Sequence, residues 1–132
     1  MHKTHISLNV ANLDQALEFY SNLFKARPAK VRPAYANFDL DNPPLKLALN
    51  ESSGAVGLSH LGVQVGDSET VFGEIERFRA IGLDSLVEEN TDCCHALQDK
   101  VWVSDPDGHK WEVFAVKGDV AAPKASGCRC SA

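Results

Sequence analysis

Two histidines, one glutamate and a pair of adjacent cysteines are the residues of this chain whose types could carry chemistry. His5 and His60 lie in two alternating apolar segments, and Glu112 lies in a third near the end of the chain. Two imidazoles and one carboxylate form the ligand set of a mononuclear metal site with open coordination positions. The adjacent thiols of Cys93 and Cys94 are soft ligands for a thiophilic atom. The sequence predicts a metal centre with a thiol pair beside it, provided that the fold brings these groups together.

The cysteine spacing argues against the common zinc modules. Cys93 and Cys94 are adjacent, and one residue separates Cys128 from Cys130, so neither pair forms a CxxC motif. A disulfide between neighbouring cysteines closes a strained ring, which favours a dithiol. Ordinary thiols have a pKa of about 8.5, so trivalent arsenic, cadmium or mercury would displace their protons on binding. The alternative is that these thiols are simply packed as small apolar groups.

The sequence does not decide the roles of three further residues, His95, Cys128 and Cys130. The polar stretch 90–95 predicts a loop, in which His95 either assists the thiols or faces solvent, and we favour solvent. Cys128 and Cys130 lie in a stretch of small residues without periodicity, which predicts a flexible tail. They either capture a soft metal and pass it to Cys93 and Cys94 or have no role, and the sequence does not decide between these.

The first half of the chain predicts a strand, a helix and three more strands. Residues 4–10 alternate, with His5 opposite the apolar face. Asn12 suits a helix N-cap, and strands are expected at 29–32, 35–40 and 45–50. The apolar stripe of the helix consists of Leu13, Ala16, Leu17, Tyr20, Leu23 and Phe24.

The second half repeats this order. Residues 59–65 alternate in the same register as residues 4–10, Asp67 or Ser68 suits the cap of a second helix, and Gly82 suits its end. The apolar stripe of this helix consists of Val71, Phe72, Ile75, Phe78 and Ile81. Strands are expected near 84–89, 100–104 and 110–116, and a turn at 105–108 joins the last two.

Aligning the halves places His60 on His5 at an offset of 55 residues (60 − 5) and Asp105 on Asp41 at an offset of 64 (105 − 41). A βαβββ unit that occurs twice predicts an α+β fold, with two modules in a pseudo-twofold arrangement around a half-open cleft. We expect one domain over residues 1–118, with modules at about 1–54 and 55–118. The flexible tail with its two cysteines then covers residues 119–132.

Strand parity predicts that the three ligands converge. If the apolar face of each strand packs on its helix, His5, His60 and Glu112 point to the opposite face and into the cleft. The second offset places Ala48 on Glu112, so the fourth symmetric position has no ligand. Three protein ligands leave room for water, dioxygen or substrate, as in non-haem Fe(II) oxygenases. The alternative is a metal-free cleft lined by the same residues.

Composition and charge limit the function classes. A net charge of −5 over 132 residues predicts no nucleic acid partner and no anionic membrane surface. No segment approaches the ~18–20 apolar residues of a spanning helix, and the N-terminus lacks an apolar signal region. We therefore expect a cytoplasmic protein with reduced cysteines. A homodimer in which modules are exchanged between chains stays open, because the two modules could pair within one chain or between two.

These residues resemble a known family. The duplicated βαβββ pattern with cleft-facing ligands resembles the vicinal oxygen chelate superfamily of glyoxalase I, extradiol dioxygenases and bleomycin-type resistance proteins. More closely, residues 2–116 look like the ArsI/CadI heavy-metal-resistance proteins, whose best understood activity is carbon–arsenic bond cleavage. The most specific stretches are EENTDCCHALQDKVWV at 88–103 and DPDGHKWEVF at 105–114.

The resemblance implies a cofactor, a substrate and roles for the residues. Fe(II) would be bound by His5, His60 and Glu112, with Ni, Co, Zn or Cd as substitutes in a purified sample. Cys93 and Cys94 would bind a trivalent organoarsenical, and cleavage with O2 would release arsenite. The preferred organic group stays open. The alternatives are a cadmium or other soft-metal binding protein without turnover and a glyoxalase-like isomerase that uses a divalent metal.

Overall fold

The eight strands within the described residues form one mixed sheet, with a helix packed on each half. The computed structural model describes residues 2–93 and 95–119, with residues 93 and 119 described by their backbone alone. The elements in chain order are β1 (Lys3–Val10), α1 (Leu13–Phe24), β2 (Lys30–Arg32), β3 (Tyr35–Asp41), β4 (Pro44–Glu51), β5 (Gly57–Gln64), α2 (Ser68–Ala80), β6 (Leu86–Cys93), β7 (Ala96–Ser104) and β8 (Lys110–Asp119). The tail cysteines Cys128 and Cys130 and the thiol-bearing Cys94 lie outside the described residues.

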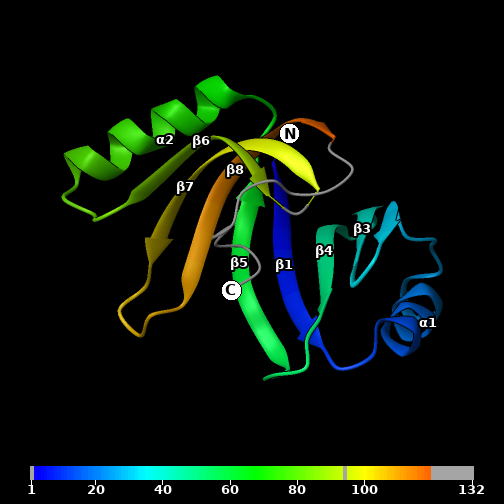
Figure 1. Cartoon of the computed structure of the whole chain (residues 1–132). Helices are drawn as coiled ribbons and strands as arrows, with labels where there is room; N and C mark the ends of the chain where they lie inside the picture. The colour runs from blue at the N-terminus through cyan, green and yellow to red at the C-terminus, as the bar shows by residue number, and fades with distance from the viewer. Residues whose placement is uncertain (1, 94, 120–132) are drawn as a thin grey trace.

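The order of strands in the sheet is β2-β3-β4-β1-β5-β8-β7-β6. The first strands of the two halves, β1 and β5, run antiparallel at the centre, and each has the last strand of its own half as a parallel neighbour. Helix α1 packs on β3 and β4, and α2 packs on β7 and β8 (Figure 1). The predicted α+β fold of two βαβββ modules is therefore confirmed.

The strand register follows the predicted internal alignment. In the first half Ile6 lies beside Leu47, and in the second half Leu61 lies beside Trp111. The offsets between these equivalent positions are 55 (61 − 6) and 64 (111 − 47), which are the offsets expected from the sequence. Paired positions of the two halves therefore correspond, with β1 and β5 as equivalent strands at the centre of the sheet.

Both helices begin at the expected caps. The side chain of Asn12 accepts a hydrogen bond from the backbone of Gln15, and that of Asp67 accepts one from the backbone of Thr70. Gly82 has a φ of 73° just beyond α2, which glycine tolerates better than other residues. Two expected core residues of α2 are instead exposed, Phe72 at 40% and Ile81 at 64%, because the sheet covers only part of this helix.

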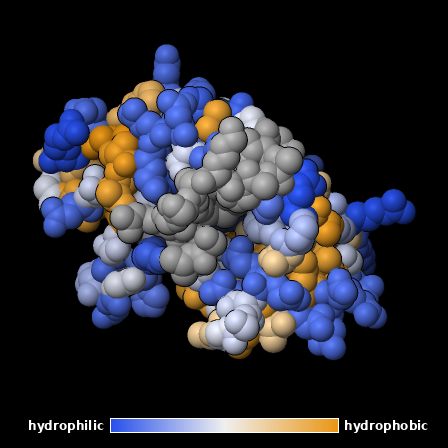
Figure 2. All heavy atoms as spheres, viewed as in Figure 1, coloured by the Kyte–Doolittle hydropathy of each residue, from blue (hydrophilic) through white to orange (hydrophobic). Residues whose placement is uncertain are grey.

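On the face seen in Figure 2, hydrophilic side chains predominate among the coloured residues, with separate hydrophobic patches, one of them over the α2 and β6 region. Exposed apolar side chains of that region are Ile81, Leu83, Leu86 and Val87. No helix within the described residues is long and apolar enough to cross a membrane.

The stretch 90–95, expected to be a loop, is mostly strand. β6 continues to Cys93 and β7 begins at Ala96, so these two residues pair across a tight hairpin. Polar composition predicted a loop, but backbone pairing with β7 decides the conformation. A register shift lies between Glu88 and Thr91, where Asn90 has a φ of 50°. This bulge lets β6 bend before it reaches the cysteine.

A buried carboxylate holds the bulge. Asp99 is 2% exposed, and its Oδ1 accepts a hydrogen bond of 2.8 Å from the backbone N–H of Asn90. Its Oδ2 accepts a hydrogen bond of 2.6 Å from Ser68 at the start of α2 and lies 3.4 Å from Nζ of Lys117. Asp99 therefore ties the helix, the bulge and the last strand together.

Replacement of Asp99 by Asn should lower the free energy of unfolding by about 1–3 kcal/mol, because the amide cannot accept both hydrogen bonds and also face Lys117 as an anion. Urea denaturation of the two proteins measures the difference. The matched control is Asp107→Asn in the exposed turn before β8, which should change stability by less than about 0.5 kcal/mol. Equal stability of Asp99→Asn and the wild type would contradict this role.

Candidate metal centre

The three predicted ligands lie on the three central strands of the sheet. His5 comes from β1, His60 from β5 and Glu112 from β8, and all three are buried, at 7%, 1% and 2% exposure. The row of paired residues across the sheet runs from His5 through Gly62 to Glu112. His60 lies two residues before Gly62 on the same strand face. The side chains therefore converge above Gly62, as strand parity predicted.

Gly62 provides the space for this convergence. A Cβ atom at this position would lie 2.8 Å from Cγ and from the carbonyl oxygen of Glu112, and 3.4 Å from Cδ2 of His5. Any side chain would therefore displace the carboxylate. The sequence placed Gly62 on the polar strand face, but only the register shows that it lies between two ligands.

The distances suit a shared ion. Nε2 of His5 lies 3.6 Å and Nε2 of His60 lies 3.5 Å from Oε1 of Glu112. One candidate ligand atom from each of the three residues can be chosen so that all lie within 4.8 Å of one another. Two ligand atoms at about 2.1 Å from one metal ion lie roughly 3.0–3.5 Å apart, which is close to the separations observed.

The donor set also fits a metal ion chemically. Nε2 of His60 is buried and, within the described part of the chain, has no hydrogen-bond partner. Nδ1 of the same ring lies 3.1 Å from the hydroxyl of Ser59. A proton on Nδ1 donated to Ser59 would leave the lone pair of Nε2 directed at the centre, which is how ligand histidines are commonly oriented. The residues present therefore fit a divalent metal.

Lys100 is the functional residue that sequence reasoning missed. This residue is 1% exposed. Its Nζ donates a hydrogen bond of 3.0 Å to Oε2 of Glu112. Lys100 thus occupies one carboxylate oxygen and leaves Oε1 for the two histidines. Parity could have found it, because Trp102 pairs with Glu112 and Lys100 lies two residues away on the same face.

The charges of the centre are mutually dependent. Burial alone would raise the pKa of Glu112, but Lys100, His60 and His5 outweigh it and lower that pKa to about 2. Burial lowers the pKa of His5 to about 4, against the opposing attraction of Glu112. Glu112 is therefore an anion and His5 a neutral imidazole at neutral pH, and these are the protonation states that bind metal.

The fourth symmetric position is apolar. Ser7 lies beside Ala48 in the first half as Gly62 lies beside Glu112 in the second, so Ala48 is the equivalent of Glu112. It is 2% exposed and offers no ligand atom. Within the described residues, the only cluster of metal-ligating side chains at this spacing is His5, His60 and Glu112.

A cavity of about 130 Å³ connects the centre with the cysteine hairpin. His5 and Glu112 line one part of it, and Ala96, which pairs with Cys93, lines another. Nζ of Lys30 on β2 donates a hydrogen bond of 2.9 Å to the backbone carbonyl of His95 at the hairpin turn. The hairpin of the second half is thereby held against the first half (Figure 1).

The remaining histidines differ in their surroundings. His95, for which solvent exposure was favoured, is half-buried, and its ring lies 5.2 Å from that of Tyr35. The reason is that the hairpin folds back onto β3 instead of projecting into solvent. His109 is exposed in the turn before β8, and its Nδ1 lies 2.7 Å from Oδ2 of Asp105.

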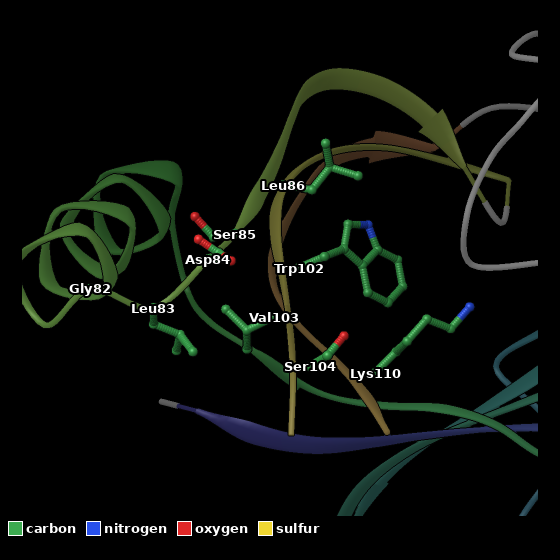
Figure 3. Close-up of a pocket in the computed structure, with 9 residues that line it drawn as sticks. All are labelled: Gly82, Leu83, Asp84, Ser85, Leu86, Trp102, Val103, Ser104 and Lys110. Carbon is green, nitrogen blue, oxygen red and sulfur yellow. The ribbon is translucent and has the colours of Figure 1, made fainter. Parts of the chain in front are cut away.

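A second, larger cavity of about 630 Å³ lies beside the centre, between the end of α2 and the strands β6 and β7 (Figure 3). Trp102 and Lys110 point into it together with Leu86. The ring centroid of Trp102 also lies 5.1 Å from that of His60. The indole therefore separates this cavity from the metal centre.

Known proteins are similar to this chain in sequence and in fold. A family model described as Glyoxalase/Bleomycin resistance protein/Dioxygenase superfamily matches residues 3–113. Cadmium-induced protein CadI of Mycobacterium tuberculosis is 52% identical over 120 residues, which are 90% of this chain and 79% of that protein. A trivalent organoarsenical cleaving enzyme of Thermomonospora curvata is 50% identical over 121 residues, which are 90% of this chain and 80% of the enzyme.

Among solved structures, the 2,3-dioxygenase LapB from Pseudomonas sp. KL28 aligns with a TM-score of 0.67 and 19% sequence identity, over 95% of this chain and 44% of that chain. At this identity the likeness concerns the fold alone.

Replacement of Glu112 by Gln should weaken divalent metal binding by more than about a hundredfold, since even outer partners of metal ligands contribute ten- to a hundredfold. The amide can still accept the hydrogen bond from Lys100 but leaves that buried ammonium without an opposite charge, so circular dichroism first checks that the variant is folded. The measurement is the metal bound per chain after loading with Fe(II) or Co(II). Glu88→Gln, whose carboxylate accepts from the indole of Trp102, is the control and should retain metal. Undiminished metal in Glu112→Gln would exclude this residue as a ligand.

The metal-free protein should lose stability as the pH falls from about 6.5 to 4. The pKa of His5 in the folded state is about 4, below its ordinary value of 6.5, so the unfolded chain binds the proton first in this window. Unfolding free energies of the wild type and of His5→Gln, measured near neutral pH and at about pH 4.5, test this. The loss on acidification should be smaller in the variant, and an equal loss would contradict the assignment.

Proposed function

The chain belongs to the Glyoxalase/Bleomycin resistance protein/Dioxygenase superfamily, and from this premise we propose that it is an Fe(II)- and O2-dependent enzyme that cleaves the carbon–arsenic bond of trivalent organoarsenicals. The product is arsenite. One observation carries the proposal: a single cavity is bounded by His5 and Glu112 on one side and by Ala96 of the cysteine hairpin on the other. In this proposal, a molecule bound by the thiols of the hairpin extends through the cavity to the metal ligands.

Iron is the metal that the ligand set favours. Two histidines and one carboxylate with open positions are typical of non-haem Fe(II) oxygenases. Iron supplies the redox chemistry with dioxygen when it is bound. The residues of the chain set its surroundings, because Lys100 restricts Glu112 to one free oxygen and Ala48 offers no further ligand.

The cysteines anchor the substrate through arsenic. Each thiol of Cys93 and Cys94 replaces one hydroxyl of the arsenical, so two As–S bonds form and two water molecules leave. The hairpin that carries them is fixed at its base by Asp99 and at its turn by Lys30. These two anchors limit where the organic group can lie, and such positioning is a major source of rate enhancement.

The relatives also support a second candidate, in which the protein sequesters cadmium or another soft metal without turnover. A relative named as cadmium-induced is 52% identical to this chain. A protein of that kind needs thiols but neither His5 nor Glu112. A third alternative, a glyoxalase-like isomerase with a divalent metal, needs no oxygen, and the absence of a ligand at Ala48 weighs against its closed ligand set.

Arsenite release from phenylarsonous acid, measured with and without Fe(II) and with and without O2, tests the proposal. Release should require both. Cys93→Ser and Cys94→Ser should each abolish arsenical binding and leave the iron content unchanged, because the thiols and the iron ligands are separate groups.

A variant with Ser at both Cys128 and Cys130 is the control and should release arsenite at the wild-type rate. Tight arsenical binding without release under every condition would favour sequestration. Turnover without oxygen would favour the isomerase, and loss of iron in the hairpin variants would mean that those thiols bind the metal itself.

A further inference from the structure

The cavity between the metal centre and the hairpin has a charged wall that the proposed function does not use. Lys46 lies on β4 directly beside His5 and faces this cavity. Lys30 and the side chain of Asn37 line the same wall. The wall thus carries two cations, and Glu112, the one carboxylate among the described residues that line the cavity, is already paired with Lys100.

Within the described residues, the ammonium of Lys46 takes part in no hydrogen bond and no ion pair. Asp39 lies directly opposite Lys46 on β3 and is the carboxylate that attracts it, but no hydrogen bond or ion pair joins the two side chains. Asp39 is paired with Lys3 instead, at 2.6 Å. A half-buried ammonium without a partner is unfavourable, so the cavity is electrostatically prepared for an anion.

A second polar atom of the wall is also unsatisfied. Asn37 is 4% exposed, and its Nδ2 donates a hydrogen bond of 3.0 Å to the hydroxyl of Tyr35, whereas its Oδ1 is buried without a hydrogen-bond partner. Oδ1 of Asn37 can accept a hydrogen bond from a donor group of a ligand, whereas an ionised oxygen substituent is an acceptor and can interact only with the cations of the wall. Burial of unsatisfied polar atoms is costly, so such atoms commonly mark the place of a ligand group.

The size of the cavity restricts the remainder of the ligand. Its volume of about 130 Å³ is slightly below the roughly 150 Å³ of a protein cavity known to hold benzene. One aromatic ring fills this space, with Phe114 and Val116 as apolar neighbours. A ring attached to arsenic at the hairpin would enter this space, which Ala96 of the hairpin and Lys46 both line.

We infer that the cavity selects aromatic trivalent arsenicals whose ring carries an anionic oxygen substituent, such as a carboxylate or a phenolate, and that Lys46 is the residue that recognises this charge. The inference rests on the proposed function for the role of arsenic. It goes beyond that function because it names the organic group that the site prefers. Lys46 acts on binding, not on the bond that is broken.

The test compares phenylarsonous acid with 4-carboxyphenylarsonous acid. Their dissociation constants are first measured on the iron-free protein by titration calorimetry, where no turnover occurs. The wild type should bind the carboxylated compound more tightly, and Lys46→Met should lose about ten- to a hundredfold of that preference, the range for a hydrogen bond to a charged group. Lys46→Arg keeps the charge and should retain most of the preference. The ratio of the kcat/KM values of the two compounds on the iron-loaded enzyme should change among these variants in the same direction as the binding preference.

Lys110→Met is the matched control. Lys110 is the equivalent of Lys46 in the second half (110 − 46 = 64), but it lines the larger cavity beside Trp102 (Figure 3). Its replacement should leave the preference unchanged. If Lys46→Met weakens the binding of both compounds equally, the inference is wrong. It is also wrong if only Lys110→Met removes the preference for the carboxylated compound. If neither compound yields arsenite although the preference in binding depends on Lys46, the proposed function fails while the anion site stands.

Discussion

The hydrogen bond from Lys100 to Glu112 is the interaction on which the centre depends. A carboxylate at 2% exposure is unfavourable unless charged partners surround it, and Lys100 supplies one such partner from the neighbouring strand. Because Lys100 occupies Oε2, Oε1 faces His5 and His60. The same ammonium helps to keep the pKa of Glu112 low, so the ligand stays ionised. Loss of either partner would leave an uncompensated charge in the interior.

Internal symmetry explains why this pair occurs once. The register makes Ala48 the equivalent of Glu112 and, at an offset of 65 on the next strand (100 − 35), Tyr35 the equivalent of Lys100. The positions of Glu112 and Lys100, which form the ion pair of the second half, are thus occupied by Ala48 and Tyr35 in the first half. With one half lacking both charges, the cleft keeps an open side next to His5. That side is the cavity to which the cysteine hairpin extends.

The sequence predicted much of the fold because two repeats carry the same information twice. The order of strands and helices could be predicted from two repeated features. These are the alternation in residues 4–10 and 59–65 and the helix caps at Asn12 and Asp67. The weaker predictions concern residues whose conformation depends on distant partners. Phe72 and Ile81 match a helical stripe but lie beyond the sheet. The stretch 90–95 is polar, yet pairing with β7 makes most of it strand.

By itself, the sequence determined the repeat and the face of each strand that carries His5, His60 and Glu112, since side-chain direction alternates strictly along a strand. Only the tertiary structure decided how close these groups come, because distances across a sheet depend on register and on the missing side chain at Gly62. The partner of Glu112 and the unpaired ammonium of Lys46 were likewise decided there. Hydrogen bonds and burial arise between strands remote in the chain. Alternation along a strand can place Lys100 and Glu112 on the same face, but only the register between the strands makes them partners.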